Sequence, residues 1–178
     1  MDVKKHIVLT GARQIGKSTL VHKLLQRCIV PLHGFVTKAT PRQPDGTHSV
    51  YLYSINDKEQ LPCCDNHIGD ACFGRRKVYP EVFDTLGLQL LSNCNDGLII
   101  MDELGFMESE ATAFCQKVLQ CFDGDIPILA VCKAKPGIEF VDQVKYHPHT
   151  ALYTVTEDSR DALYSELLSV LISRNLAK

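Results

Sequence analysis

The sequence predicts an α/β fold with a mainly parallel central sheet that helices cover on both faces. Several short segments are apolar almost throughout, as is typical of strands buried on both sides. Segments with apolar residues at helical spacing alternate with these runs, which favours parallel strands joined by helices. The length of 178 residues suits one domain with its own hydrophobic core. We therefore expect residues 1–178 to form a single domain.

The first elements predict a strand, a helix and a hairpin. Residues 6–10 form an apolar run that indicates a strand, and residues 19–25 carry apolar side chains at helical spacing. Residues 34–38 and 48–55 alternate in polarity and are rich in β-branched and aromatic side chains. Because Pro44-Asp45-Gly46 between them is a turn signal, we expect the two segments to pair as a β-hairpin.

Residues 56–77 show no periodicity, so we expect an insertion loop. Loops of this length are uncommon inside compact domains and are often functional, which makes the segment a candidate lid. Pro80 then suits the first turn of a helix that reaches about Asn93. The later elements alternate, with strands at 97–101, 126–132 and 150–155 and helices at 108–122, 138–144 and, after the capping residues Thr156-Glu157-Asp158, on to about Ser173.

Charge and composition exclude several classes of protein. The chain has 19 Lys and Arg against 21 Asp and Glu, a formal net charge of -2, so it lacks the strong basic character of a dedicated nucleic-acid binder. Its longest uninterrupted apolar run, at 98–101, is far shorter than the roughly 20 residues that cross a bilayer. Residues 1–6 contain no signal-peptide core. We expect a cytoplasmic protein without a nucleic-acid or membrane partner, and the sequence does not predict its oligomeric state.

The eight cysteines do not suggest a secreted disulfide scaffold, because they are dispersed among predicted helices and strands and the chain shows no export signal. Five resemble small core residues. For the other three, grouped around His67, two interpretations stay open, a zinc site or spare thiols, and their irregular spacing is a poor match to zinc. The core group is Cys28, Cys94, Cys115, Cys121 and Cys132, and the loop group is Cys63, Cys64 and Cys72.

A phosphate-binding loop is the most specific motif in the chain. Residues 11–18 match G-x-x-x-x-G-K-[ST] between a predicted strand and a predicted helix, which is the context the motif requires. The glycines let backbone N–H groups surround an anion, Lys17 reaches the β- and γ-phosphates, and the Ser18 hydroxyl ligates Mg²⁺. The predicted nucleotide-binding residues are Gly11, Ala12, Arg13, Gln14, Ile15, Gly16, Lys17, Ser18 and Thr19.

A pair of carboxylates follows a buried strand later in the chain. Asp102 closes this strand and can hold Mg²⁺ together with Ser18. Glu103 comes next and can accept a proton from the water that attacks the γ-phosphorus, or orient that water. An ordinary solvated strand end would also carry two acidic residues, but the phosphate loop makes the metal-binding interpretation the better one. We expect Lys17 and Glu103 to be the catalytic residues.

Three motifs give the chain a family resemblance that extends from about Lys5 to Leu163. Residues 102–108 have the form D-E-x-G-x-M-E, residues 34–37 the form G-F-x-T, and residues 155–161 the form V-T-x-x-x-R-D. Together with the phosphate loop they resemble the THEP1 family, also called the cancer-related nucleoside-triphosphatases. The resemblance implies a RecA-like three-layer αβα sandwich. It also implies Mg²⁺-dependent hydrolysis of ATP, GTP and other nucleoside triphosphates (NTPs) to diphosphate and phosphate, with broad base tolerance.

The resemblance also assigns residues. It implies the phosphate loop, Asp102 for Mg²⁺ and Glu103 for water activation, and it adds Arg160 as a residue near the nucleotide. The chain departs from the family pattern at Arg13-Gln14, where Pro-Gly is usual, and at Ser159, where Asn is usual. The G-K-Y motif of the family has no clean counterpart, and the basic segment 74–77 is the nearest match.

Two further questions stay open at the level of sequence. Arg13, Arg75 and Arg76 are each candidates for the charge that stabilises the γ-phosphate in the transition state. The same fold also suits two other functions. A kinase would transfer the phosphate to a nucleotide or another small acceptor beneath a lid, and a nucleotide-dependent switch would hydrolyse NTP only incidentally.

Overall fold

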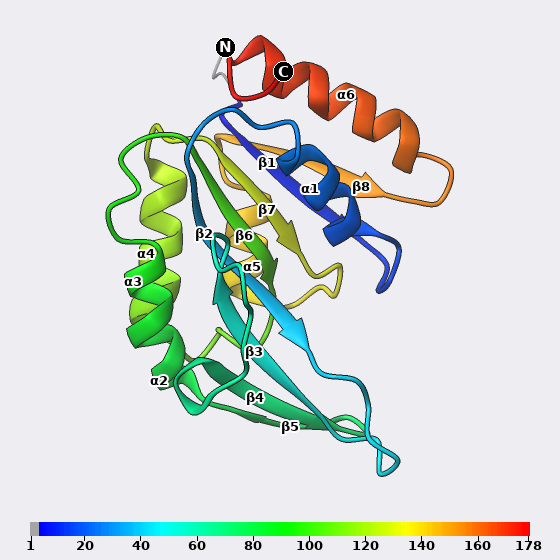
Figure 1. The fold of residues 1–178 in the computed structure, drawn as a ribbon, viewed down its shortest axis with the longest axis vertical. Helices are drawn as coiled ribbons and strands as arrows, with labels where there is room; N and C mark the ends of the chain where they lie inside the picture. Colours follow the sequence, from blue (N-terminus) through cyan, green and yellow to red (C-terminus); the bar gives the residue numbers. More distant parts are fainter. Residues whose placement is uncertain (1–3) are drawn as a thin grey trace.

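The computed structural model describes residues 4–178. The prediction that residues 1–6 contain no signal-peptide core therefore lies partly outside the described residues. One eight-stranded sheet with flanking helices contains most of these residues (Figure 1). The strands are β1 (His6–Gly11), β2 (Leu32–Ala39), β3 (His48–Ser54), β4 (His67–Cys72), β5 (Arg75–Val78), β6 (Leu98–Leu104), β7 (Ile128–Cys132) and β8 (Thr150–Val155). The α-helices are α1 (Lys17–Leu25), α2 (Pro80–Val82), α3 (Leu88–Leu90), α4 (Thr112–Asp123), α5 (Glu139–Lys145) and α6 (Arg160–Ser173).

The sheet is parallel over five strands and antiparallel over the other three. Its order is β5-β4-β3-β2-β6-β7-β1-β8. The strands from β2 to β8 in this order run parallel, whereas β3, β4 and β5 each run antiparallel to the preceding neighbour. The predicted mainly parallel sheet is therefore confirmed, and so is the hairpin, which β2 and β3 form.

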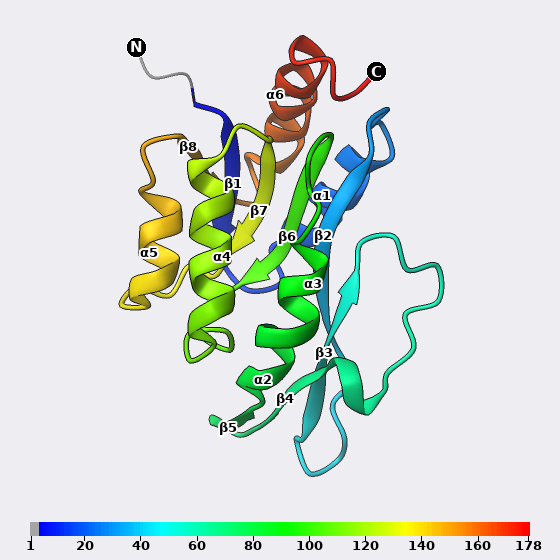
Figure 2. The same cartoon turned by 90° about the vertical axis from the view of Figure 1, so that its left-hand side faces the viewer.

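Helices cover both faces of the sheet. Along β1, Ile7 and Leu9 pack with α1 and α6, while Val8 points to the opposite face, where α4 and α5 lie (Figure 2). Each of these three side chains is at most 2% exposed. This alternation explains why the strand is apolar at every position, and it gives the three-layer arrangement that the sequence predicts.

The expectation of a loop over residues 56–77 is wrong for most of that segment. A short 3-10 helix spans Cys64–Asn66, and β4 and β5 follow, so within this segment residues 56–63 and the turn at 73–74 lie outside helices and strands. The sequence hides β5 because Arg75, Arg76 and Lys77 are exposed at the sheet edge, and charged side chains are a common way to protect an edge strand from pairing with another chain. An exposed edge strand shows no apolar alternation.

The boundaries of several helices also differ from the prediction. The helix expected over 80–93 ends at Leu90 and contains a π-helical turn over Phe83–Gly87. Helix α4 begins at Thr112 rather than at Glu108, because residues 105–108 form a turn in which the Glu108 side chain accepts the Gly105 N–H. The neighbouring helical segment supplies the cap of α4, since the Asp84 carboxylate accepts the Phe114 N–H at 2.9 Å.

All eight cysteines are free thiols. Cys132 is buried, the other four predicted core cysteines are half-buried, and Cys63 and Cys64 are exposed. Within residues 4–178, no three His, Cys, Asp or Glu side chains gather as a metal-binding group. In the same part of the chain, no helix is both long and apolar enough to cross a membrane.

Candidate active site

The phosphate loop connects β1 to α1 at the carboxyl edge of the sheet. Gly16 has φ +100°, in the left-handed region that favours glycine. A Cβ on Gly11 would lie 2.5 Å from the Val155 carbonyl oxygen, so the start of the loop has no room for a side chain. Helix α1 has no side-chain cap and no acidic residue in its first turn. Its first N–H groups are therefore available to an anion at the positive end of the helix.

Lys17 extends along the loop from the first position of α1. Its ammonium group donates hydrogen bonds to the carbonyl oxygens of Gly11 and Ala12, at 3.0 and 2.9 Å. The side chain is only 7% exposed. A cation held on the loop carbonyls is placed where the β- and γ-phosphates of an NTP would come within its reach.

Ser18 and Asp102 meet beside this lysine. The Ser18 hydroxyl donates to an Asp102 carboxylate oxygen at 3.0 Å. Burial raises the pKa of Asp102 to about 6, against the opposing effects of the Ser18 hydrogen bond and the Lys17 charge. A hydroxyl and a carboxylate are the oxygen donors that Mg²⁺ uses beside phosphates, and a cation at this point would offset the cost of the buried negative charge. The residues present therefore fit Mg²⁺.

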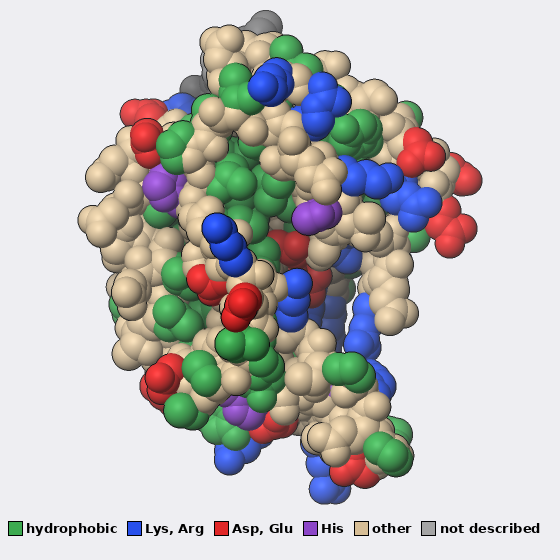
Figure 3. All heavy atoms as spheres, viewed as in Figure 1, with side chains coloured by type: hydrophobic (Ala, Val, Ile, Leu, Met, Phe, Trp, Pro, Cys, Tyr) green, Lys and Arg blue, Asp and Glu red, His purple; other side chains and the backbone are tan. Residues whose placement is uncertain are grey.

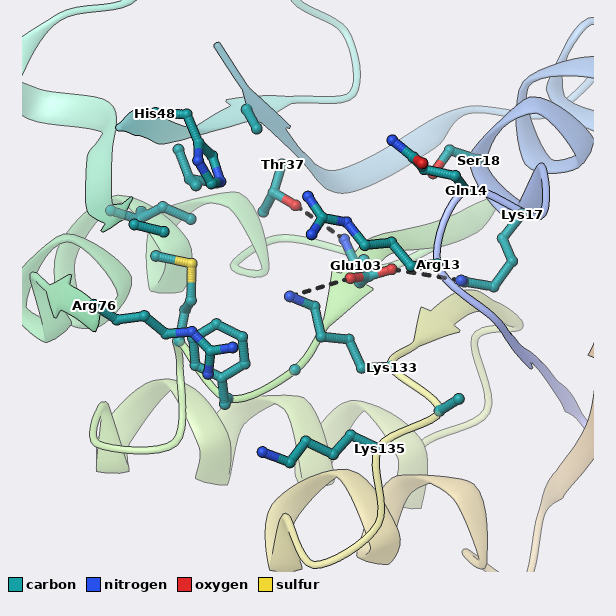
Figure 4. A pocket seen from close by; sticks show the side chains of 18 of the residues that line it. Arg13, Gln14, Lys17, Ser18, Thr37, His48, Arg76, Glu103, Lys133 and Lys135 are labelled. Atoms are coloured by element: carbon teal, nitrogen blue, oxygen red, sulfur yellow. Dashed lines mark hydrogen bonds and ion pairs between the residues drawn. The ribbon is translucent and has the colours of Figure 1, made fainter. Parts of the chain in front are cut away.

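Glu103 lies between two lysines at the end of β6 (Figure 4). Its carboxylate is 4.0 Å from the Lys17 ammonium and 3.4 Å from that of Lys133. Its backbone N–H donates to the Thr37 hydroxyl of β2 at 3.3 Å. The side chain is half-buried and lines the cavity, so it is held in place but stays accessible to a water molecule.

The turn after β6 carries an aromatic platform. Phe106 lies under two cations, with the Arg76 guanidinium carbon 3.6 Å and the Lys133 ammonium 4.4 Å from the ring centroid. Glu108 holds the same turn through its contact with the Gly105 N–H. Burial raises the pKa of Glu108 to about 7, although that hydrogen bond and the Lys133 charge oppose the rise.

A cavity of about 820 Å³ joins these groups. It opens on the face shown in Figure 3, where Lys and Arg side chains border the hollow. It extends from the phosphate loop past Glu103 to the tips of two hairpins, one between β2 and β3 and one between β4 and β5. Such a volume lies in the range of small-molecule sites.

The structure brings together most of the residues that the sequence singles out. Seven residues of the predicted loop line the cavity, together with Asp102 and Glu103. Ala12 and Ile15 do not line it. Arg160 lies outside the lining but against the loop, with its Cδ and Nη1 atoms 3.3 Å from the position of a Cβ on Gly16. The seven are Gly11, Arg13, Gln14, Gly16, Lys17, Ser18 and Thr19.

Sequence reasoning missed Lys133 and Lys135, which follow β7 and line the cavity. A signal was available, because β7 was predicted as a buried strand and its carboxyl end meets those of β1 and β6 at one edge of the sheet. Thr37, Phe106 and His48 were also missed. Phe106 follows Glu103 by three residues in the turn after β6. Thr37 and His48 reach the cavity only because β2 pairs with β6, which the chain order does not predict.

Comparison with known proteins gives consistent matches over nearly the whole chain. The family model NTPase_1, described as NTPase, matches residues 6–168. Nucleoside-triphosphatase THEP1 of Thermotoga maritima is 27% identical, covering 93% of this chain and 94% of the relative. The human cancer-related nucleoside-triphosphatase is 27% identical, covering 95% and 97%. The crystal structure of THEP1 from Aquifex aeolicus matches the fold with a TM-score of 0.77 at 23% identity, covering 93% of this chain and 98% of that one.

Proposed function

We propose, on the premise that the chain belongs to the NTPase_1 family of nucleoside-triphosphatases, that it hydrolyses Mg²⁺-bound NTPs to diphosphate and phosphate with broad base tolerance. The observation that carries the proposal is the 3.0 Å contact between Ser18 and Asp102 beside Lys17. It joins the loop that can hold phosphates to the carboxylate that can hold a metal ion. One domain supplies the whole site, from residues 11–19, 102–103 and 133.

The phosphate loop binds and orients the triphosphate. The free N–H groups at the start of α1 surround the phosphate oxygens, and the Lys17 ammonium leaves the loop carbonyls for the β- and γ-phosphates. Ser18 and Asp102 would hold Mg²⁺, and the ion would offset charge that builds up on the phosphate oxygens in the transition state.

Glu103 positions the attacking water and takes its proton. The lysines on either side, Lys17 and Lys133, fix the direction of the carboxylate and offset its charge as the γ-phosphate approaches. For the charge that stabilises the transition state we favour Arg13, because it belongs to the phosphate loop and lines the same cavity as Glu103. Arg76 is stacked on Phe106 on the far side of Glu103, and Arg75 is its neighbour on β5.

Arg160 supports the proposal of broad base tolerance. Its side chain is exposed and lies against the loop at Gly16, outside the lining of the cavity that contains Glu103. A guanidinium group can stack on the face of any nucleobase, and such stacking depends little on base identity. We therefore place the base against Arg160.

The test is phosphate release from ATP, GTP, CTP and UTP without an acceptor, with Mg²⁺ and with EDTA. We expect release from all four that EDTA abolishes. Glu103→Gln should lower release by about 10²–10⁴-fold, the usual contribution of a general base, while nucleotide binding persists. The matched control is Glu110→Gln, since Glu110 is exposed and outside the cavity lining.

Three other outcomes of this assay would contradict the mechanism or favour an alternative function. Unchanged release in Glu103→Gln would contradict the assigned mechanism. Release that requires a second substrate would indicate the kinase alternative. Tight nucleotide binding with negligible turnover would indicate the nucleotide-dependent switch.

A further inference from the structure

The cavity continues past the proposed position of the γ-phosphate. Figure 4 shows His48 and Arg76 on the side of Glu103 that faces away from Lys17 and Ser18. We call this part of the cavity the hairpin chamber. It is lined by Arg42, His48, Phe73, Arg75, Arg76 and Phe106.

Two contacts join the hairpin tips that form the chamber wall. The Cys72 thiol donates to the Asp45 carbonyl oxygen at 3.4 Å. The Phe73 ring packs on Gly46 so closely that a Cβ there would lie 2.5 Å from it. The tips therefore form one continuous wall, although 27 residues separate Cys72 from Asp45 in the chain.

The cavity carries more positive charge than an NTP complex requires. Seven Lys and Arg side chains line it, against three carboxyl groups, which leaves a surplus of at least four positive charges. A Mg²⁺-bound NTP has a net charge of about -2, because the ion offsets about half of the triphosphate charge. About two positive charges remain, which matches a phosphate monoester at pH 7. The cations are Arg13, Lys17, Arg42, Arg75, Arg76, Lys133 and Lys135, and the carboxylates are Asp102, Glu103 and Glu108.

The surplus is concentrated in the hairpin chamber. Among residues 4–178, no carboxylate lies within 4.0 Å of Arg42, Arg75 or Arg76. Arg76 is nevertheless held in place, because its guanidinium lies on the Phe106 ring. A cation that is positioned by an aromatic ring and has no carboxylate partner is available to bind an anion from a ligand.

Phe73 is a second feature that points to a ligand. Its side chain is 79% exposed, and its φ of +41° lies in the left-handed region that bulky residues rarely adopt. The two-residue turn between β4 and β5 accounts for positive φ at both Phe73 and Gly74, so the backbone conformation belongs to the hairpin. The feature that points to a ligand is the exposed Phe73 ring in the cavity lining. The uncovered ring offers a surface for an apolar or ring-shaped ligand group.

We propose that the hairpin chamber binds a phosphate monoester with a ring-shaped body, in the same cavity as the NTP. The phosphate contacts Arg75 and Arg76, and the ring packs against Phe73. This inference rests on the proposed function in one respect, since that function places the γ-phosphate on the loop side of Glu103. A ligand in the chamber then fills the side from which water approaches.

The test uses phenyl phosphate as the probe and measures phosphate release over a range of Mg²⁺·ATP concentrations. We expect the probe to lower kcat without changing KM for ATP, because the two ligands occupy different parts of the cavity. Benzyl alcohol, which has the ring but no phosphate, should not inhibit. Arg76→Gln should raise the inhibition constant about tenfold through the loss of charge-assisted hydrogen bonds. The control Lys58→Gln, an exposed cation outside the cavity lining, should leave that constant unchanged.

Four results would overturn the proposal. Competition with ATP would place the probe in the phosphate loop. Equal inhibition of wild type and Arg76→Gln would show that Arg76 is not the anchor, and absence of inhibition at about 10 mM probe, well above a millimolar Kd, would refute the site. A loss of about 10³-fold in kcat of Arg76→Gln without the probe would assign this arginine to the γ-phosphate instead.

The failure of the proposed function would look different. If the wild type releases no phosphate, calorimetry with phenyl phosphate still tests the chamber, after the protein is saturated with Mg²⁺ and a non-hydrolysable ATP analogue. Binding that Arg76→Gln weakens supports the chamber, and no binding refutes it.

Discussion

Replacing Glu108 with Gln should change how the stability of this protein depends on pH. The Glu108 side chain is 3% exposed and accepts the Gly105 N–H in the turn after β6. Burial raises its pKa from 4.5 to about 7. In the folded protein this carboxyl therefore keeps its proton at pH values where the unfolded chain has already lost it.

The sign and size of the effect follow from this difference. Between pH 4.5 and 7 the folded state binds more protons than the unfolded state, so the free energy of unfolding falls as the pH rises. The loss is complete above pH 7 and absent below pH 4.5. One pKa unit corresponds to about 1.4 kcal/mol, so the change from 4.5 to about 7 is worth about 3 kcal/mol. For a domain of this size, that corresponds to about 6–12 °C in Tm.

The assay is urea or thermal unfolding of wild type and Glu108→Gln at intervals from pH 4.5 to pH 8. The difference between the two proteins isolates Glu108, because other titrating groups are common to both. The amide oxygen of Gln can still accept the Gly105 N–H without a buried charge. We expect the variant to gain stability relative to wild type as the pH rises. Glu108→Ala is the control for the hydrogen bond and should lose about 1–3 kcal/mol, because it leaves the N–H unpaired.

Parallel pH profiles of wild type and Glu108→Gln would refute the reasoning. They would show that Glu108 is ionised in the folded state throughout this range, so that its neighbours, Lys133 above all, offset the cost of burial.

Two other predictions concern stability at the ends of β1. Gly11→Ala should unfold at a lower temperature than wild type, by the equivalent of about 2 kcal/mol or more, because the new Cβ would meet the Val155 carbonyl at 2.5 Å and φ is +146°. An unchanged Tm would contradict the close approach. His6 is fully buried, its Nε2–H contacts the Phe122 carbonyl at 2.9 Å, and burial lowers its pKa to about 4 from 6.5. Stability should therefore fall as the pH drops from 6.5 to 4, since the unfolded chain binds the proton first. Denaturant titrations at pH 5 and 7 measure this loss, and a His6→Gln profile with the same slope would exclude His6 as its source.

The parallel part of the sheet could be predicted because its sequence pattern has one physical cause. Strands β1, β6 and β7 are buried on both faces, so each is apolar at nearly every position. The phosphate loop was equally clear, because only a few residue types can surround an anion with backbone N–H groups. The family membership and the nucleoside-triphosphatase activity inferred from these motifs are confirmed by the family match over residues 6–168. The individual roles of Lys17, Asp102, Glu103 and Arg160 stay predictions.

The rest could not be predicted because it depends on which segments become neighbours. Lys133 reaches Glu103 only because β7 lies beside β6. Arg76 reaches Phe106 only because three antiparallel strands extend the sheet and bring β5 back toward the cavity. Strand β3 was predicted, but β4 alternates weakly and β5 is charged, so their local pattern resembles a loop.

The two parts of the cavity share β2, and this constrains how they can act together. Thr37 of β2 accepts the Glu103 N–H at 3.3 Å, while the next strand, β3, carries His48 into the hairpin chamber. Val36 pairs with Asp102 on one side of β2 and with Tyr53 on the other. A ligand that shifts the joined hairpin tips would therefore move β2, the strand that accepts the Glu103 N–H. Because a base displaced by about 1 Å can cost about 10²-fold in rate, occupancy of the chamber should alter turnover by geometry as well as by excluding water.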